Sequence, residues 1–175
     1  LLLSNALPLE RFLEDVRRDP PVRVPGTAVF MNSNISGTPA ALQHNVRHNH
    51  VLHERNILLT ARTQQVPRVE DTAERLQVTP LGDGFWQVIV NFGFTEEPDV
   101  PAVLASLDRP DFPLDLTHLT YFLGRETLIA TRHIDHMAPW RERLFVAMQR
   151  NATNATSYFR LPSNQVIELG SQVEI

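Results

Sequence analysis

The amino-acid sequence predicts a single α/β domain built on a mixed, mostly parallel sheet of about six strands, with helices packed on the sheet faces. Three observations support this prediction. Short apolar segments alternate with segments of helical periodicity, the elements run in the order α-β-α-β-β-β-α-β-α-β, and Gly82-Asp83-Gly84 joins two neighbouring strands as a hairpin. The 175 residues suffice for one sizeable core.

An amphipathic helix is expected at residues 7–19. Its apolar residues recur at helical spacing: Leu9, Phe12, Leu13 and Val16. Pro20 and Pro21 end this helix and begin an extended connector. We therefore expect residues 1–23 to lead into a domain that occupies residues 24–175.

A β-α-β unit follows the connector. Residues 27–31 and 57–61 are compact apolar strands, which is typical of buried parallel strands. Thr38 and Pro39 predict a helix start between them, with Thr38 as the N-cap, and the helix is expected to run to about Asn49.

The second half of the chain completes the pattern. Its expected elements are strands at 75–80 and 85–94, a short helix at 98–107, a strand at 119–123 ending at Gly124, a helix from Pro139 with an apolar stripe up to Ala152, and a strand at 165–175. These elements complete the expected sheet.

Composition removes several classes of function. The net charge of −4 argues against nucleic acid as a partner, because neutralising phosphates needs a basic surface. The absence of cysteine excludes disulfides, thiolate metal sites and cysteine nucleophiles. No apolar run approaches the roughly 20 residues that span a bilayer. We expect no cofactor.

The loop at residues 32–38 is the first candidate ligand site. It follows a buried strand and leads into a helix, and ligands of open α/β sheets bind at such carboxyl ends. Asn32, Ser33, Asn34 and Thr38 are the candidate contacts. The alternative is that this loop only turns the chain, because it matches neither the Walker pattern nor GxGxxG.

The histidines form the second candidate. His44 and His48 are spaced four apart, which allows two imidazoles to bind zinc from one helical face. No HExxH pattern is present, and both positions lie opposite the apolar stripe of their helix. A polar helix surface is therefore the preferred interpretation, with a metal site or a pH sensor as alternatives.

A third candidate is a protein contact at Arg125 and Glu126, which follow a buried strand. A structural ion pair is the alternative. No GxSxG elbow or other catalytic pattern is present, so no catalytic residue is assigned. A small-molecule enzyme whose site assembles from distant residues stays open as an alternative function.

Several motifs together resemble the C-terminal soluble region of the Kup-type (KUP/HAK/KT) potassium uptake transporters. They are Val24-Pro-Gly-Thr-Ala-Val-Phe30, Pro39-Ala-Ala-Leu-Gln-His-Asn45, Val51-Leu-His-Glu-Arg-Asn56, Phe94-Thr-Glu-Glu-Pro-Asp-Val100, Tyr121-Phe-Leu-Gly-Arg-Glu-Thr127, Trp140-Arg-Glu-Arg-Leu-Phe145 and Val166-Ile-Glu-Leu-Gly-Ser-Gln-Val-Glu-Ile175. Their order is preserved along nearly the whole chain after about residue 20.

The resemblance implies a regulatory or structural domain on the cytoplasmic face of the bacterial inner membrane. Family members import potassium, with protons, through a transmembrane part that this chain lacks, and residues 1–23 would connect to that part. The implied partners are the transmembrane part, a second copy in a homodimer, and a nucleotide second messenger such as cyclic di-AMP or an adenine nucleotide. Related transporters carry a universal-stress-protein-like domain, which is one possible form of the fold.

Overall fold

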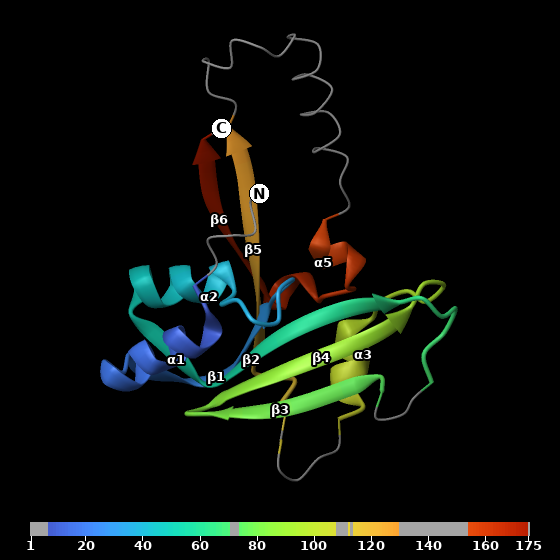
Figure 1. Ribbon diagram of the computed structural model, residues 1–175, viewed down its shortest axis with the longest axis horizontal. Coiled ribbons are helices and arrows are strands. Elements are labelled where there is room, and N and C mark those ends of the chain that lie inside the picture. Colours follow the sequence, from blue (N-terminus) through green and yellow to red (C-terminus); the bar gives the residue numbers. More distant parts are fainter. Residues whose placement is uncertain (1–6, 71–73, 108–111, 113, 130–153, 175) are drawn as a thin grey trace.

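A six-stranded mixed sheet in the order β3-β4-β2-β1-β5-β6 organises the computed structural model (Figure 1). The structure describes residues 7–70, 74–107, 112, 114–129 and 154–174, without the side chains of 125–129 and 171–174. Only the β3–β4 pair is antiparallel, and the other pairs of described strands are parallel. The predicted α/β class, the strand number and the single hairpin are confirmed.

The β-α-β unit consists of β1 (Val22–Met31), α2 (Ala40–His44), the π-helix η1 (Asn45–Asn49) and β2 (Val51–Gln64). The two strands pair in parallel, with Val29 beside Ile57. His50 ends the helical segment in the left-handed conformation, at φ 55°. Both strands are longer than predicted, since the prediction counted only the apolar residues 27–31 and 57–61. The polar residues on either side of these segments also pair in the sheet.

Helix α1 (Leu9–Arg18) forms a layer on the same sheet face as α2 (Figure 1). Its four apolar residues are buried, as their spacing predicted. Phe12 contacts the ring of Phe85 edge-on, with ring centroids 6.2 Å apart. The lead-in helix is therefore part of the hydrophobic core. The predicted domain boundary at residue 23 stays a prediction.

Two hydrophobic clusters lie on opposite faces of the sheet. The cluster beneath α1 and α2 includes Phe12, Phe30, Leu42, Leu58, Phe85 and Phe122. The other lies beneath α3 (Val100–Ala105) and includes Val29, Leu59, Val88, Phe92, Leu104 and Tyr121. Adjacent residues of one strand, such as Leu58 and Leu59, belong to different clusters, as strand geometry requires. Both faces of the central strands are thereby covered.

The hairpin joins β3 (Leu76–Gly82) to β4 (Phe85–Gly93). Gly82, Asp83 and Gly84 all have positive φ, which glycine adopts without strain. A Cβ on Gly84 would overlap the carbonyl oxygen of Glu54, so this position admits no side chain. Arg17 of α1 forms an ion pair with Asp83 at 2.5 Å, which attaches the turn to the helix layer.

Strand β5 (Leu119–Ile129) pairs with β1 only from Leu119 to Phe122 and continues beside β6 (Val166–Glu174). Figure 1 shows these two strands rising away from the rest of the sheet. The prediction that this strand ends at Gly124 is wrong, because β6 pairs with β5 through Ile129. The final strand is confirmed.

Two short elements, α5 (Ala155–Tyr158) and the 3₁₀ turn η2 (Ser163–Gln165), precede β6. They carried no signal in the sequence. The predicted helix from Pro139 to Ala152 lies outside the described residues.

Candidate functional site

The loop at residues 32–38 leaves the carboxyl end of β1, which lies between β2 and β5. From β1 the chain proceeds through α2 to β2 on one side, whereas β5 lies on the other side. Such a switch point leaves a crevice at the carboxyl ends of the strands. The position expected for a ligand loop is therefore present.

The amide side chains of this loop bind the loop itself. Asn32 donates from Nδ2 to the carbonyl oxygen of Gly37 at 2.8 Å. The Oδ1 atom of Asn34 accepts from the backbone N–H of Ser36 at 3.2 Å and from its hydroxyl at 3.1 Å. These bonds fix the loop in one shape, while Ser33 is exposed. Of the four candidate contacts, Ser33 is the one whose side chain is exposed to solvent.

Thr38 is buried, with 3% of its surface exposed. Its hydroxyl donates to the carbonyl oxygen of Leu7 at 2.8 Å, and its backbone N–H donates to the same oxygen at 2.9 Å. The prediction of Thr38 as a helix N-cap is wrong: α2 begins at Ala40, and Pro39 precedes it without a side-chain cap. The hydroxyl holds the start of α1 instead.

The histidines His44 and His48 stack, with ring centroids 5.8 Å apart and planes 12° apart. His48 is exposed and His44 half-buried, whereas Leu42 of the same helical segment is fully buried. Among the described residues, no group of three or more His, Cys, Asp or Glu side chains is placed to hold a metal ion. The pair offers two imidazole ligands, and the metal hypothesis stays a prediction.

Another histidine, His53, is half-buried. Its ring packs edge-on against Phe122 at 5.7 Å, and its Nδ1 atom has no hydrogen-bond partner among the described residues. Burial lowers the pKa of His53. Protonation of this ring is therefore disfavoured in the folded chain.

The backbone of Arg125 and Glu126 lies in β5, beside Gly170 and Ser171 of β6. The expected position after a strand end is wrong, because the strand continues through both residues. Their side chains are outside the described part of the chain, so the proposed contact stays a prediction.

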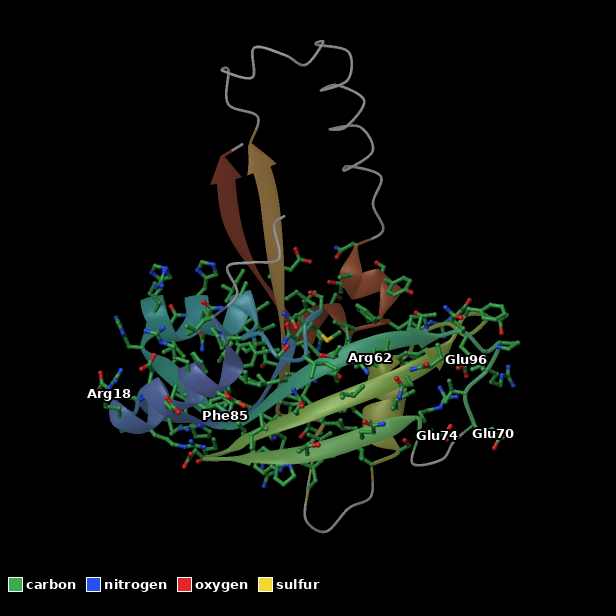
Figure 2. All side chains as sticks on the ribbon, in the orientation of Figure 1. Arg18, Arg62, Glu70, Glu74, Phe85 and Glu96 are labelled. Carbon is green, nitrogen blue, oxygen red and sulfur yellow. The ribbon has the colours of Figure 1, made fainter. Side chains whose placement is uncertain are left out.

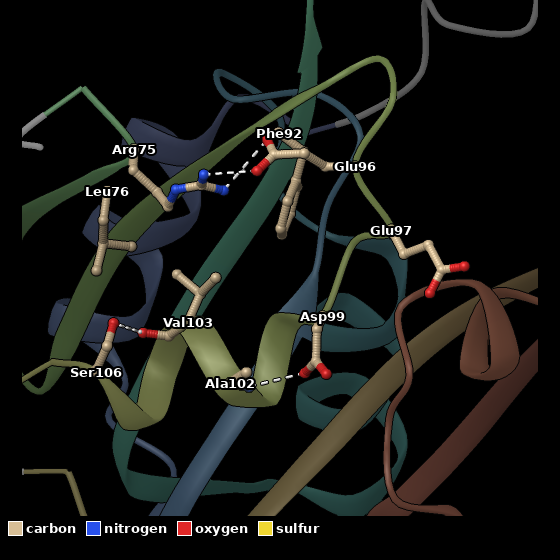
Figure 3. Close-up of a pocket in the computed structure, with 9 residues that line it drawn as sticks. All are labelled: Arg75, Leu76, Phe92, Glu96, Glu97, Asp99, Ala102, Val103 and Ser106. Carbon is tan, nitrogen blue, oxygen red and sulfur yellow. Dashed lines mark hydrogen bonds and ion pairs between the residues drawn. The ribbon is translucent and has the colours of Figure 1, made fainter. Parts of the chain in front are cut away.

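A cavity of about 630 Å³ opens beside α3 (Figure 3). Its walls combine apolar and charged side chains, including Leu76, Phe92, Val103, Arg75, Glu96 and Asp99. The contact between Arg75 and Glu96 was not predicted from the sequence. The predicted hairpin could have indicated it, because Arg75 precedes β3 and Glu96 follows β4. The start of one strand of an antiparallel pair lies beside the end of the other.

Glu96 connects three segments of the chain. Its carboxylate accepts from Arg75 at 2.7 Å, from the backbone N–H of Val69 at 3.1 Å and from that of Gly93 at 2.5 Å. The Arg75 guanidinium, followed by the two backbone donors, lowers the pKa of Glu96 to about 2 against the opposing effect of burial. Both side chains of the pair are 13% exposed.

The remaining charges of the cavity are also engaged. Asp99 caps α3, since its Oδ1 atom accepts from the N–H of Ala102 at 2.9 Å. Arg160 forms ion pairs with Glu97 and Asp99. Burial, with the Asp99 carboxylate as a second cause, raises the pKa of Tyr121 to about 12. With one arginine and three carboxylates in its lining, the cavity disfavours phosphate groups.

A family model described as the K+ potassium transporter C-terminal domain matches residues 25–175. The chain belongs to this family. The resemblance drawn from separate motifs is thereby confirmed, because the match extends over the motifs and the residues between them.

Relatives of this K+ potassium transporter C-terminal domain carry potassium transport names. The "Probable potassium transport system protein Kup 2" of Chromobacterium violaceum is 45% identical over 99% of the chain, which spans 28% of that protein. The "Probable potassium transport system protein Kup" of an Anaeromyxobacter strain is 49% identical over 100% of the chain, or 27% of its own length. That of Myxococcus xanthus is 48% identical over 99%, or 26% of its length.

The chain therefore spans a little over a quarter of these relatives. No solved structure matches it. None of the helices in the described residues is long and apolar enough to cross a bilayer.

Proposed function

We propose that this chain is the cytoplasmic regulatory domain of a bacterial, proton-coupled potassium importer, and that the ion pathway lies in another part of that protein. The alignment of potassium transport proteins over 98–100% of the chain carries the proposal. The proposed location is the cytoplasmic face of the inner membrane. The relatives are named as transport proteins, which favours this role over a catalytic one.

Regulation requires the domain to bind one transport state more tightly than another. Helix α1 is suited to couple the domain to a preceding part, because it packs in the core and the N–H of its first residue, Leu9, donates to the carbonyl oxygen of Ser36 in the 32–38 loop. A displacement of α1 would disturb both features. We propose that residues 1–23 transmit the conformational state between the membrane part and the domain.

Truncation of the importer before residue 1 tests the proposal. Rubidium uptake is measured in a potassium-uptake-deficient bacterium that carries either the full-length or the truncated protein at equal membrane levels. We expect the uptake rate or its dependence on external pH to change several-fold. Identical uptake at every potassium concentration and pH would reject a regulatory role.

The membrane side is tested separately. A protease added to inverted vesicles, whose cytoplasmic face is outside, is expected to release the domain. Cleavage only in right-side-out spheroplasts would contradict the cytoplasmic location.

A nucleotide-sensing domain is a second candidate, because the 32–38 loop lies at the carboxyl end of a central strand. The proposed contacts are the backbone of the loop with Ser33, since Asn32, Asn34 and Thr38 already hold the loop. Calorimetric titration with cyclic di-AMP, ATP and AMP tests it. No heat from any of the three at near-millimolar protein would remove this candidate.

Two further contacts complete the proposal. We propose that two copies associate as a homodimer and that Arg125 and Glu126 take part in a protein contact on the β5–β6 pair. Sedimentation of the full-length protein in detergent measures whether it is a dimer. The contact is tested by reversing the charges of Arg125 and Glu126, with Glu168→Arg as the neighbouring control. An unchanged oligomeric state and unchanged uptake after the reversal would contradict the contact.

A further inference from the structure

The sheet divides into two parts beyond the end of β1. Strand β1 ends at Met31, whereas its two neighbours, β2 and β5, continue past this level. Figure 1 shows β5 and β6 rising away from the other strands, and Figure 2 shows Arg62 and Glu96 at the far ends of β2 and β4, away from that pair. Sheet twist rotates each strand relative to the next, so strands diverge once no strand lies between them.

One edge of β5 carries no described strand over residues 123–129. Strand β1 pairs with β5 only up to Phe122, and β6 is the one described strand that pairs with β5 beyond that residue. The side of β5 that faces away from β6 therefore presents backbone N–H and C=O groups to the space that β1 leaves. Such an edge is a template for the addition of a further strand. We call it the open edge of β5.

The β5–β6 pair would gain stability from a third strand. Two strands alone are marginally stable in water, and a parallel pair is slightly less stable per residue than an antiparallel one. A strand on the open edge binds the N–H and C=O groups there and makes the pair part of a wider sheet. The structure thus indicates a place for an extended segment.

The described chain begins beside the base of this edge. The carbonyl oxygen of Leu7 accepts from the hydroxyl and the N–H of Thr38, at 2.8 and 2.9 Å. Two residues after Thr38 is Ala40, whose Cβ would lie 3.6 Å from a Cβ on Gly124 of β5. Leu7 is therefore only a few residues' width from the first part of the open edge, and on the face of the sheet that α1 and α2 cover.

The loop at residues 32–38 occupies the other side of this entry point. The N–H of Asn32 donates to the backbone of β2 at 2.8 Å, and Nε2 of Gln87 on β4 donates to the carbonyl oxygen of Ile35 at 2.8 Å. The first half of the loop thus faces β2 and β4, whereas its last residue holds Leu7. The strand edge within reach of the chain before Leu7 is that of β5.

We propose that residues 1–6 pair with the open edge of β5 as an antiparallel strand. The direction follows from the entry point: Leu7 lies near the start of the edge and β5 runs away from it, so the preceding residues follow the edge only by running opposite to β5. Six extended residues span about 20 Å, which is close to the length of residues 123–129. The role of this strand rests on the proposed function, because it joins the sheet to the preceding part of the transporter.

The composition of the segment suits this position. Residues 1–6 read Leu-Leu-Leu-Ser-Asn-Ala and contain neither proline nor a charged residue, the two features that keep a segment from pairing at a strand edge. The segment is also covalently joined to Leu7, which gives it a high effective concentration at the edge. A second copy of the domain, the other possible occupant, lacks this advantage.

Disulfide scanning in the full-length transporter tests the pairing. The domain has no cysteine, and any others in the protein are removed. Cysteine then replaces Leu2, Ser4 or Ala6 together with one of residues 124–129. Opposite residues of an antiparallel pair have Cα atoms about 4.5–5.5 Å apart, which a disulfide spans. We expect disulfides within one polypeptide, formed most readily by pairs whose residue numbers add up to one constant sum.

The control for this scan is Arg62→Cys, at an exposed position on the diverging part of β2. It is expected to form no disulfide with positions 2, 4 or 6. The proposal is overturned by pairs that share a constant difference, which indicates a parallel strand, or by disulfides that join two copies only. Disulfides to position 62 alone, or none at all, overturn it equally.

Proline substitution provides a second measurement. In a strand, one of two neighbouring residues directs its N–H to the partner, so Leu3→Pro with Ser4→Pro removes a bond in either register. We expect amide hydrogen exchange of residues 123–129 in the full-length protein to become about tenfold faster. The matched control is Leu3→Ala with Ser4→Ala, which keeps both N–H groups and should leave exchange unchanged. Equal exchange in the two variants contradicts the pairing.

The pairing and the regulatory function fail in different ways. If truncation before residue 1 changes uptake but no constant-sum disulfides form, the pairing is wrong and the regulatory function stands. If these disulfides form but truncation leaves uptake unchanged, the pairing stands and the regulatory function is wrong.

Discussion

The carbonyl oxygen of Leu7 accepts two hydrogen bonds from Thr38, one from the hydroxyl at 2.8 Å and one from the backbone N–H at 2.9 Å. Leu7 lies two residues before the start of α1, and Thr38 lies two residues before the start of α2. The contact fastens the lead-in helix to the loop at the carboxyl end of β1. Four predictions concern this contact and the others that position the candidate sites, and a fifth concerns the histidine pair.

Thr38→Val removes the hydroxyl and keeps the shape of the side chain. Because the lost bond is buried, we expect the free energy of unfolding to fall by about 1 kcal/mol. Amide hydrogen exchange in α1 should accelerate, as measured by NMR or mass spectrometry. The control is Ser33→Ala at an exposed position of the same loop, and equal exchange in both variants would contradict the role of Thr38.

Phe12→Ala tests whether α1 belongs to the core. Phe12 is 5% exposed and contacts Phe85, so its removal leaves a cavity between helix and sheet. We expect a loss of about 3–5 kcal/mol in urea unfolding. Arg11→Ala on the exposed side of α1 should cost less than about 0.5 kcal/mol. Similar losses for both would indicate that α1 is only an appendage.

Glu96 makes stability dependent on acid pH. Its pKa is lowered from 4.5 to about 2 in the folded chain, so the stabilisation is fully present above pH 4.5 and is lost as the pH falls toward 2. Glu96→Gln should cost about 2 kcal/mol at pH 7 and flatten the stability profile between these values. Glu97→Gln, at a carboxylate 74% exposed, should keep the wild-type profile in urea unfolding across that range. A profile unchanged by Glu96→Gln would refute this account.

Glycine is required at Gly93, because a Cβ there would overlap the backbone of Pro67 and Arg68. Gly93→Ala should therefore cost more than about 2 kcal/mol and loosen the turn after β4, which Glu96 holds. Gly124→Ala is the matched control, since its Cβ would meet the Cβ of Ala40 at an ordinary 3.6 Å. Thermal unfolding of both variants checks the difference, which a comparable melting temperature would disprove.

The paired substitution His44→Ala and His48→Ala tests the metal hypothesis. The stacked rings supply two ligands, whereas structural zinc sites use four. We expect the zinc content and the melting temperature to stay unchanged, with or without a chelator. Loss of bound zinc in the variant would instead establish a metal site at this pair.

Much of the fold follows from periodicity alone. The spacing of Leu9, Phe12 and Val16 predicted a helix with one buried face, and that face is buried. The apolar segments around Val29 and Ile57 predicted neighbouring parallel strands, and these residues pair. Such predictions succeed because the spacing of apolar residues decides whether a helix or a strand can bury them all on one face.

The candidate sites depended less on local pattern. Thr38 was expected to cap the next helix, yet its hydroxyl binds a residue 31 positions earlier in the chain. Arg75 and Glu96 are 21 residues apart and meet only because the β3–β4 hairpin closes. A polar side chain has several compatible hydrogen-bond partners in the sequence. It bonds the one that the fold brings within hydrogen-bond distance, and the sequence pattern alone does not identify that partner.

The sequence by itself determined the α/β class, the two faces of the strands, the hairpin glycines and, through its motifs, membership of the potassium transporter family. The tertiary structure decided that the lead-in helix is part of the core, that the strand through Arg125 continues, and that Glu96 joins the turn after β4 to Arg75 and Val69. The physical reason is the separation of the interacting residues along the chain. Hydrophobic periodicity is a relationship between residues close in sequence. Hydrogen bonds and exposure depend on distances between residues far apart in sequence, which are set only when the sheet has assembled.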